Sequence, residues 1–417
     1  MSVLSRRLNK TAIPLDQIAD LMQRNRRQGP GYSFTVPSPR SYPYQWLWDS
    51  CFHAVILSYL EPEQAKAELR TLVSRQFKNG MLPHMIYWEK ADATHFPDIR
   101  WGKRGTSSLT QPPLLANAVW QVYANTRDER FLAELYPAVK QFHRYWLRHR
   151  DPRRNHLIGL VNPDESGEDN SPRFDRALKL PAQHDFDKNF RRRLQLVDAY
   201  RDMRFVVKDK MDTMHWVRDV PVNAMLARAF ELEAVMAEVL DRPEDIERAL
   251  QHSMLIKQAM RRYMLGKYGQ MWSTVGRDYR PVKIRSWALF APLVAGALTH
   301  EEVDQLLDLH WHDPDGFAAP FRLPTVALSE RSFDAGYARS TGVPYHLNWR
   351  GPVWFASNWL VYHGLKRYGR HSEAMQLRRD SLRLLRRSGF REYYNPLTGQ
   401  GLGAQDFTWG GLVIDMI

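Results

Sequence analysis

Apolar residues recur every three to four positions along most of the chain, whereas the strict alternation of half-buried strands is rare. This spacing predicts amphipathic helices wherever a pattern exists. A first helix is expected over about 15–26, in the sequence LDQIADLMQRNR, and a last helix over about 406–416. The pattern therefore predicts an all-α protein.

Between these two, the predicted helices come in couples joined by only a few residues. Proline or acidic residues begin several of them, as in LEPEQAKAEL, TRDERFLAEL and DRPEDIERAL. Proline fits the first helical turn, and acids interact favourably with its exposed N–H groups. The expected couples are about 48–60 with 62–76, 112–126 with 128–149, 219–239 with 243–264, 284–297 with 299–309, and 352–368 with 371–389.

If the first and last helices also pair, the chain contains six couples. This arrangement predicts an (α/α)6 barrel, a six-hairpin toroid in which an inner ring of helices is enclosed by an outer ring. One such barrel accounts for residues 1–417 as a single domain.

The segments that join one couple to the next are much longer than the turns within couples. In an alternating ring these segments all emerge at one end, and YPYQWLWDS (42–50) should reach the same end. Long loops in compact domains usually carry function, so we expect the site there. The segments are about 77–111, 150–218, 265–283, 310–351 and 390–405, and the largest insertions are 77–111, 150–218 and 310–351.

Aromatic residues make up 12% of the chain and include 14 tryptophans, which is more than a core needs. Some of them are therefore expected to line a concave site for a flat or ring-shaped ligand. Carboxylates among such rings suit a sugar, because the rings stack on its C–H faces while the acids bind hydroxyls. The aromatic residues of the long connections are Tyr87, Trp88, Trp101, Trp272, Trp349 and Tyr393.

The formal net charge of +13 raises the question of a nucleic-acid partner. The basic residues form short groups with acids nearby, without zinc-finger, RNP-like or basic-zipper spacing, which favours a solvated basic surface. No apolar run has membrane-spanning or signal-peptide length, and Cys51 is the only cysteine. We expect a cytoplasmic protein without nucleic-acid or membrane partners. Cys51 is expected to be buried as a small hydrophobic residue, although a nucleophilic role stays open. A homo-oligomer also stays possible.

Candidate chemistry concentrates in DESGEDNSPRFD, residues 164–175, which contains five carboxylates. Mutual repulsion together with burial would raise the pKa of whichever carboxyl is least exposed, which suits a general acid. Gly167 allows a tight turn, and Pro172 with Arg173 could fix the far side. A solvated acidic loop and a calcium loop stay open, although the order of residues does not match an EF-hand.

A second carboxylate candidate is Glu392, which precedes two tyrosines and a glycine-rich loop in FREYYNPLTGQGLGAQDFTWGG (390–411). Asp49, at a helix start, is a third. Each could equally be a hydrogen-bonded structural residue. The sequence has no zinc-ligand spacing, no serine-hydrolase elbow and no P-loop, so we expect no metal. The histidines are scattered and are expected in loops or in the core, among them His84, His215, His310 and His312.

Taken together, several motifs resemble glycoside hydrolase family 63 and its trehalase-like relatives. The resemblance spans about residues 42–411. Within the family, the compact size of the chain is most similar to that of the bacterial mannosylglycerate and glucosylglycerate hydrolases. The motifs are YQWLWDS, LPHMIYW, TSSLTQPPLLA, ESGEDNSPRF, NWRGPVW and EYYNPLTGQGLGAQDFTW.

The resemblance implies an inverting α-glycosidase that cleaves a small hexosyl glycerate without a cofactor. By position, it implies that Asp169 is the general acid and Glu392 the general base. The partner would be a small-molecule sugar, held by further residues that the same comparison suggests. These are Tyr42, Trp46, Trp48, Asp49, Tyr87, Gln111, Gly167, Trp349, Arg350 and Trp354.

One residue departs from the family pattern, and the partner of the glycerate carboxylate stays open. Asn348 stands where the resemblance leads us to expect an aromatic residue, and Arg201 or Arg204 could bind the glycerate carboxylate. The sequence does not choose between mannose and glucose. A trehalase-like or oligosaccharide α-glucosidase, and a non-catalytic carbohydrate-binding barrel, remain the alternatives.

Overall fold

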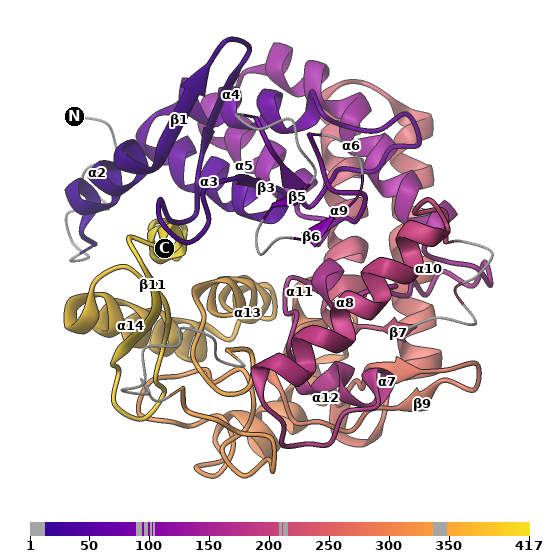
Figure 1. Cartoon of the computed structure of the whole chain (residues 1–417), viewed down its shortest axis with the longest axis vertical. Coiled ribbons are helices and arrows are strands. Elements are labelled where there is room, and N and C mark those ends of the chain that lie inside the picture. The colour runs from indigo at the N-terminus through magenta and orange to yellow at the C-terminus, as the bar shows by residue number, and fades with distance from the viewer. Residues whose placement is uncertain are drawn as a thin grey trace.

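Among the residues that the structure describes, an inner ring of helices closes on itself (Figure 1). The structure is a computed structural model and describes residues 13–88, 94–95, 99–100, 102, 105–207, 211, 216–336 and 348–417. Each helix of the inner ring contacts the next, and the last contacts the first. In order they are α3 (Leu47–Leu60), α5 (Leu115–Thr126), α9 (Val220–Val239), α11 (Pro292–Ala295), α13 (Phe355–Arg367) and the 3-10 helix η7 (Thr408–Asp415).

An outer ring of helices packs against this inner ring. The first helix, α2 (Leu15–Asn25), contacts η7, so the expected pairing of the first and last helices is confirmed. The (α/α)6 barrel is therefore the fold. The remaining outer helices are α4 (Pro62–Val73), α6 (Glu129–His149), α10 (Pro243–Met264), α12 (His300–Leu306) and α14 (His371–Ser388).

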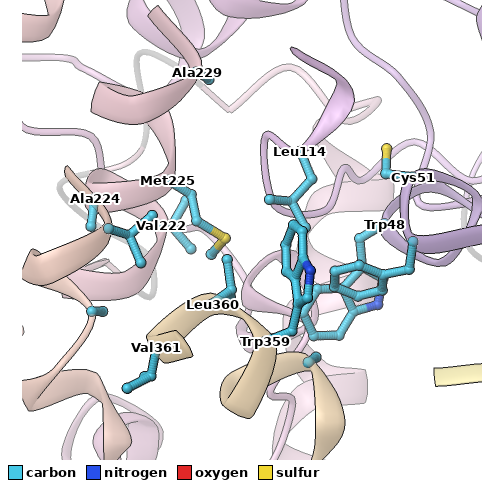
Figure 2. Close-up of a cluster of buried hydrophobic side chains, with 14 of the residues drawn as sticks. Trp48, Cys51, Leu114, Val222, Ala224, Met225, Ala229, Trp359, Leu360 and Val361 are labelled. Carbon is cyan, nitrogen blue, oxygen red and sulfur yellow. The ribbon is translucent and has the colours of Figure 1, made fainter. Parts of the chain in front are cut away.

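The two rings differ in sequence because they differ in surroundings. In α3, residues 47–58 are all buried, since the helix contacts both its inner neighbours and its outer partner. The outer helix α6, in contrast, buries one face and exposes the other. Figure 2 shows side chains of α3, α9 and α13 meeting in the core, including Trp48, Met225 and Trp359. Cys51 is among the buried residues, and burial raises the pKa of its thiol well above the ordinary value.

Two predicted helices have a different form. The segment predicted as a helix over 284–297 is a 3-10 turn (Trp287–Leu289) followed by the single turn of α11, which begins at Pro292 and ends at Ala295, before Gly296. The last predicted helix is the 3-10 helix η7. The sequence reading also missed α7 (Asp175–Leu178) and α8 (Phe186–Asp202), both inside the connection 150–218.

Short antiparallel strands cap several connections, and the periodicity did not reveal them because most are two to five residues long. No helix in the described part of the chain is long and apolar enough to cross a membrane. The pairs are β1 (Arg26–Gly29) with β2 (Tyr32–Thr35), β3 (Gln45–Trp46) with β4 (Met85–Ile86), β5 (Thr94–His95) with β6 (Ile99–Arg100), and β10 (Arg391–Tyr394) with β11 (Gly401–Gln405). A three-stranded sheet joins β7 (Val217–Arg218), β8 (Thr274–Val275) and β9 (Arg280–Pro281).

Candidate active site

A pocket of about 1020 Å³ is lined by five of the six connections that lead from an outer helix to an inner one. This agrees with the expectation that these connections share one end of the barrel. The connection between α10 and α11, which was expected to contribute, supplies none of the lining. The contributing segments lie within 37–49, 84–111, 164–193, 348–354 and 391–409.

The pocket brings together most of the predicted site residues. Two of them do not line it. Tyr87 is buried behind the wall, with its ring edge-on to Tyr44 at 5.2 Å between centroids. Arg350 is also buried, where it pairs with Asp175 and donates to the carbonyl of Ala182 at 3.0 Å. The residues that do line the pocket are Tyr42, Trp46, Trp48, Asp49, Gln111, Gly167, Asp169, Trp349, Trp354 and Glu392.

Indole rings form much of the lining. Trp349 and Trp354 stack with centroids 4.1 Å apart and an interplanar angle of 6°. Trp48 meets Trp409 edge-on at 4.9 Å. Such rings present flat apolar faces to a ligand.

Of the aromatic residues singled out in the long connections, Trp349 and Tyr393 line the pocket, but Trp88 and Trp272 do not. Trp88 instead stacks on Tyr32 at 5.1 Å. Trp101 lies outside the described residues.

The acidic loop is not a solvated surface loop, because each of its five carboxylates has an arginine partner. Burial nevertheless raises the pKa of Asp164 to about 6 and raises that of Glu168. Of the two causes that the sequence suggested, burial is the larger; repulsion adds to it, from Asp169 at Asp164 and from Asp219, outside the loop, at Glu168. The ion pairs are Glu165 with Arg150, Glu168 with Arg173, Asp175 with Arg350, and both Asp164 and Asp169 with Arg193.

Gly167 has the role that its position predicted. Its φ of +73° lies in the left-handed region, which side chains with a Cβ rarely adopt. A Cβ there would also come within 2.5 Å of the Trp48 ring. Glycine therefore lets the loop turn directly over Trp48, between Asp164 and Asp169.

Glu392 lies on β10 at a register shift between Arg391 and Tyr393. Its Oε1 accepts a hydrogen bond from the Tyr42 hydroxyl at 2.7 Å, and its Oε2 accepts one from the Ala404 N–H at 2.8 Å. Burial raises the pKa of Glu392 to about 7, and the nearby charge of Asp169 raises it further, against these two hydrogen bonds. Glu392 can therefore change protonation state near neutral pH.

Asp49, the third carboxylate candidate, is also buried in the pocket wall. Its Oδ1 accepts a hydrogen bond from the Trp409 indole at 2.7 Å, and burial raises the pKa of Asp49 to about 6. Gln111, from a different connection, accepts a hydrogen bond from the backbone N–H of Trp48 at 3.3 Å. These polar groups stand among the rings where ligand hydroxyls would need partners.

Sequence reasoning missed several residues of the lining. His84 contacts the Ser107 hydroxyl through Nδ1 at 2.6 Å, and burial lowers its pKa to about 3, so its ring is neutral at neutral pH. Its motif, LPHMIYW, was noticed, but a lone histidine there gave no sign of a site. Arg193 was missed because α8 was missed. Other unpredicted residues of the lining include Arg40, Phe190, Arg391 and Trp409, whereas Asp164 was among the candidate carboxylates.

In the described part of the chain, no group of three or more His, Cys, Asp or Glu is placed to hold a metal ion. The cationic side chains of the lining are Arg40, Arg193 and Arg391. Arg201 and Arg204, suggested earlier for a carboxylate ligand, do not line the pocket, and Arg201 pairs with Asp198.

Comparison with known proteins gives consistent matches over nearly the whole chain. Residues 42–410 match the family model described as the mannosylglycerate hydrolase MGH1-like glycoside hydrolase domain. A mannosylglycerate hydrolase of Thermus thermophilus is 34% identical, covering 94% of this chain and 97% of its own. A glucosylglycerate hydrolase of Mycolicibacterium hassiacum is 30% identical, covering 90% and 92%. The crystal structure of a Thermus thermophilus family 63 mannosylglycerate hydrolase with Tris and D-glycerate matches with a TM-score of 0.85 and 31% identity, covering 97% and 99%.

Proposed function

The chain belongs to the MGH1-like glycoside hydrolases of family 63, and from this premise we propose that it cleaves a small α-hexosyl glycerate into hexose and glycerate. The protein is an O-glycosyl hydrolase. Relatives named for mannosylglycerate and for glucosylglycerate both align along the chain, so either hexose fits the proposal. The lone, buried cysteine allows no intrachain disulfide, which supports a cytoplasmic setting.

The observation that carries the proposal is the pair of carboxyl groups, Asp169 and Glu392, that two separate connections bring to one tryptophan-lined pocket. In the proposed reaction, Asp169 donates a proton to the glycosidic oxygen as the bond to the anomeric carbon breaks. Glu392 takes a proton from the water that attacks this carbon from the opposite face. Solvent then returns a proton to Asp169 and removes one from Glu392.

Such a reaction inverts the anomeric carbon and needs room for the water. We therefore expect the two carboxyl groups to stand about 6.5 to 9.5 Å apart. The environment of Glu392 supports its role, because donors on both oxygens hold the carboxylate while its protonation changes near neutral pH.

The two parts of the substrate have complementary surroundings. The Trp349–Trp354 stack, Asp49 and Gln111 offer ring faces and hydroxyl partners to the hexose. Arg40 and Arg391 line the same pocket and supply positive charge for the glycerate carboxylate. Arg193 is less suited to bind the glycerate carboxylate, because it is already ion-paired with two aspartates.

A substrate panel tests the proposal. It contains α-mannosyl and α-glucosyl glycerate, trehalose and α-linked oligosaccharides, with the product anomer followed by NMR. We expect turnover of at least one hexosyl glycerate, with a β-hexose as the first product. Preference for trehalose or an oligosaccharide would instead assign a trehalase-like or α-glucosidase activity, and an α-hexose product would contradict inversion.

Two isosteric variants test the residue roles. Asp169→Asn and Glu392→Gln should each lower kcat by at least about a hundredfold, because each removes a proton-transfer group, with the fold intact by circular dichroism. Asp304→Asn, at an exposed ion pair with Arg370, is the matched control and should keep the wild-type rate. A carbohydrate-binding barrel without activity would bind sugars equally well in all three variants and turn over none.

A further inference from the structure

Asp164 and Asp169 share a single nitrogen of Arg193. The Nη1 atom lies 2.6 Å from Asp164 Oδ1 and 2.8 Å from Asp169 Oδ2. All three residues line the pocket; the side chains of Arg193 and Asp164 are 7% and 12% exposed, and that of Asp169 is 30% exposed. Arg193 comes from α8 (Figure 1). Its Nε donates to Asn189 Oδ1 of the same helix at 3.1 Å. The guanidinium group is thus fixed between the two carboxyl groups.

The charges of these three groups do not balance without a proton. Two ionised carboxylates and one guanidinium sum to −1 in a largely buried place, and burial disfavours net charge. One added proton makes the group neutral. Either carboxyl group can take that proton, since both contact the same guanidinium nitrogen. Burial raises the pKa of Asp164 to about 6, and the neighbouring Asp169 also raises it.

A general acid has to carry a proton at the working pH, yet an arginine beside it favours the ionised form. Resting on the proposed function, we propose that Asp164 and Arg193 are positioning residues that keep a proton available to Asp169. Asp164 engages the charge of Arg193 as an ion pair, and this leaves Asp169 free to hold the proton that it donates.

The other groups around the three residues agree with this arrangement. Glu392 on β10 and Tyr42 before α3 interact electrostatically with Asp169, and an ionised Glu392 disfavours a second negative charge there. Tyr200 of α8 interacts with Asp164 and keeps its proton, because burial raises its pKa well above the ordinary value. Among the described residues, Arg193 is therefore the cation in direct contact with both aspartates.

The test is the pH profile of kcat/KM for Asp164→Asn, which keeps the shape of the side chain and removes its charge. Arg193 then pairs with Asp169 alone and favours its ionised form. We expect the alkaline limb, which reports loss of the donated proton, to move to lower pH by about one unit or more. At pH 8 kcat should fall about tenfold with KM little changed. Asp304→Asn serves again as the control with an unshifted profile.

A second substrate separates a proton-supply role from a structural one. An α-hexosyl fluoride needs little protonation of its leaving group, so Asp164→Asn should keep most of the wild-type rate on it. Arg193→Gln should move the alkaline limb to higher pH, and it carries the test if Asp164→Asn does not fold. An unshifted limb in the variant that folds, or equal losses on fluoride and natural substrate, would overturn the inference. A wild-type protein that hydrolyses neither would instead reject the proposed function.

Discussion

The hydroxyl of Tyr42 and the backbone N–H of Ala404 both donate to Glu392, and they favour its ionised form against the effect of burial. At the scale of single residues, this balance would set the acidic limb of activity in the proposed mechanism, in which Glu392 is the general base. A general base has to be ionised, so kcat/KM should fall about tenfold per pH unit below the pKa of Glu392, which is about 7.

Tyr42→Phe removes one of these donors and leaves the ring in place. The hydrogen bond from Tyr42 lowers the pKa of Glu392, so its loss should raise that pKa and move the acidic limb to higher pH. The measurement is the pH profile of kcat/KM. A limb that stays in place, or moves to lower pH, would show that Tyr42 does not favour the ionised form of Glu392.

Glu392→Gln should have an effect on stability that depends on pH. The carboxyl binds a proton more tightly in the folded protein than in the unfolded chain, where its pKa is near 4.5. Wild-type stability is therefore lost as the pH rises from about 4.5 to about 7, whereas Gln does not titrate. Between pH 5 and pH 8, the unfolding free energy of the variant relative to wild type should rise by about 2 to 3 kcal/mol. Urea unfolding at both pH values measures it, and a constant difference would contradict the raised pKa.

Sequence reasoning could find the site residues that lie in short motifs containing acidic, glycine and aromatic residues. Asp169 and Glu392 stand among glycines, acids and aromatics, and both line the pocket. Arg193 could not be found this way, because its role depends on contacts with Asp164 and Asp169 that form only in the folded chain. Arg350 was expected to support either the loop or the substrate; its side chain pairs with Asp175 of the acidic loop and does not line the pocket.

At the scale of elements, buried ion pairs hold the acidic loop in shape. Arg173 is buried, and its guanidinium group binds both Glu168 and Asp219, which precedes α9. The Trp287 indole donates to the same Glu168 at 2.9 Å. The loop that carries Asp169 is thereby tied to the inner ring.

Arg173→Met should destabilise the protein by about 3 to 5 kcal/mol, because it leaves two buried carboxylates without their cation. Arg70→Met, which breaks an exposed pair with Glu134, is the matched control and should cost less than about 1 kcal/mol. Urea unfolding curves give both values. Equal effects of the two changes would show that the loop does not depend on this pair.

Helical periodicity was a good guide where a helix packs one face on the barrel, as in α6, α10 and α14. It was wrong over 284–297, where buried apolar residues are almost continuous and Pro292 and Gly296 confine the helix to one turn. It missed α8, whose charged sequence FDKNFRRRLQLVDAYRD buries few positions, Asn189 and Arg193 among them. Burial of polar groups against a site does not produce an apolar stripe.

At the scale of the whole molecule, one side chain joins the ends of the ring. Asp415 in η7 accepts hydrogen bonds from the Tyr59 hydroxyl of α3 at 2.6 Å and the Trp359 indole of α13 at 2.7 Å. His363 of α13 adds a third contact at 2.8 Å. The three inner helices that close the barrel therefore meet at a single carboxylate.

Asp415→Ala should lower the unfolding free energy by about 2 to 4 kcal/mol, because it leaves the half-buried donor of Tyr59 and the buried donor of Trp359 without this acceptor. The loss should appear in urea unfolding, with the pH profile of activity unchanged since Asp415 lies outside the pocket lining. The exposed Asp304→Asn is again the comparison. A variant as stable as wild type would show that the ring closes without this contact.

The number and order of the helix couples could be read from the sequence, because each couple repeats the same local signals. The contact of Asp415 that closes the ring could not be read from the sequence, since its partners Tyr59 and Trp359 lie far from it along the chain.

The residues that line the pocket run from Pro37 to Trp409. A fragment that lacks either end of this range therefore does not contain the whole pocket. A nascent polypeptide emerging from the ribosome presents Asp169 long before Glu392 is synthesised. The pocket is complete only once η7 has packed between α3 and α13, because Trp409 of η7 is part of its lining. Polypeptides truncated before residue 392 lack one of the two carboxyl groups, and under the proposed mechanism they should hydrolyse no glycoside.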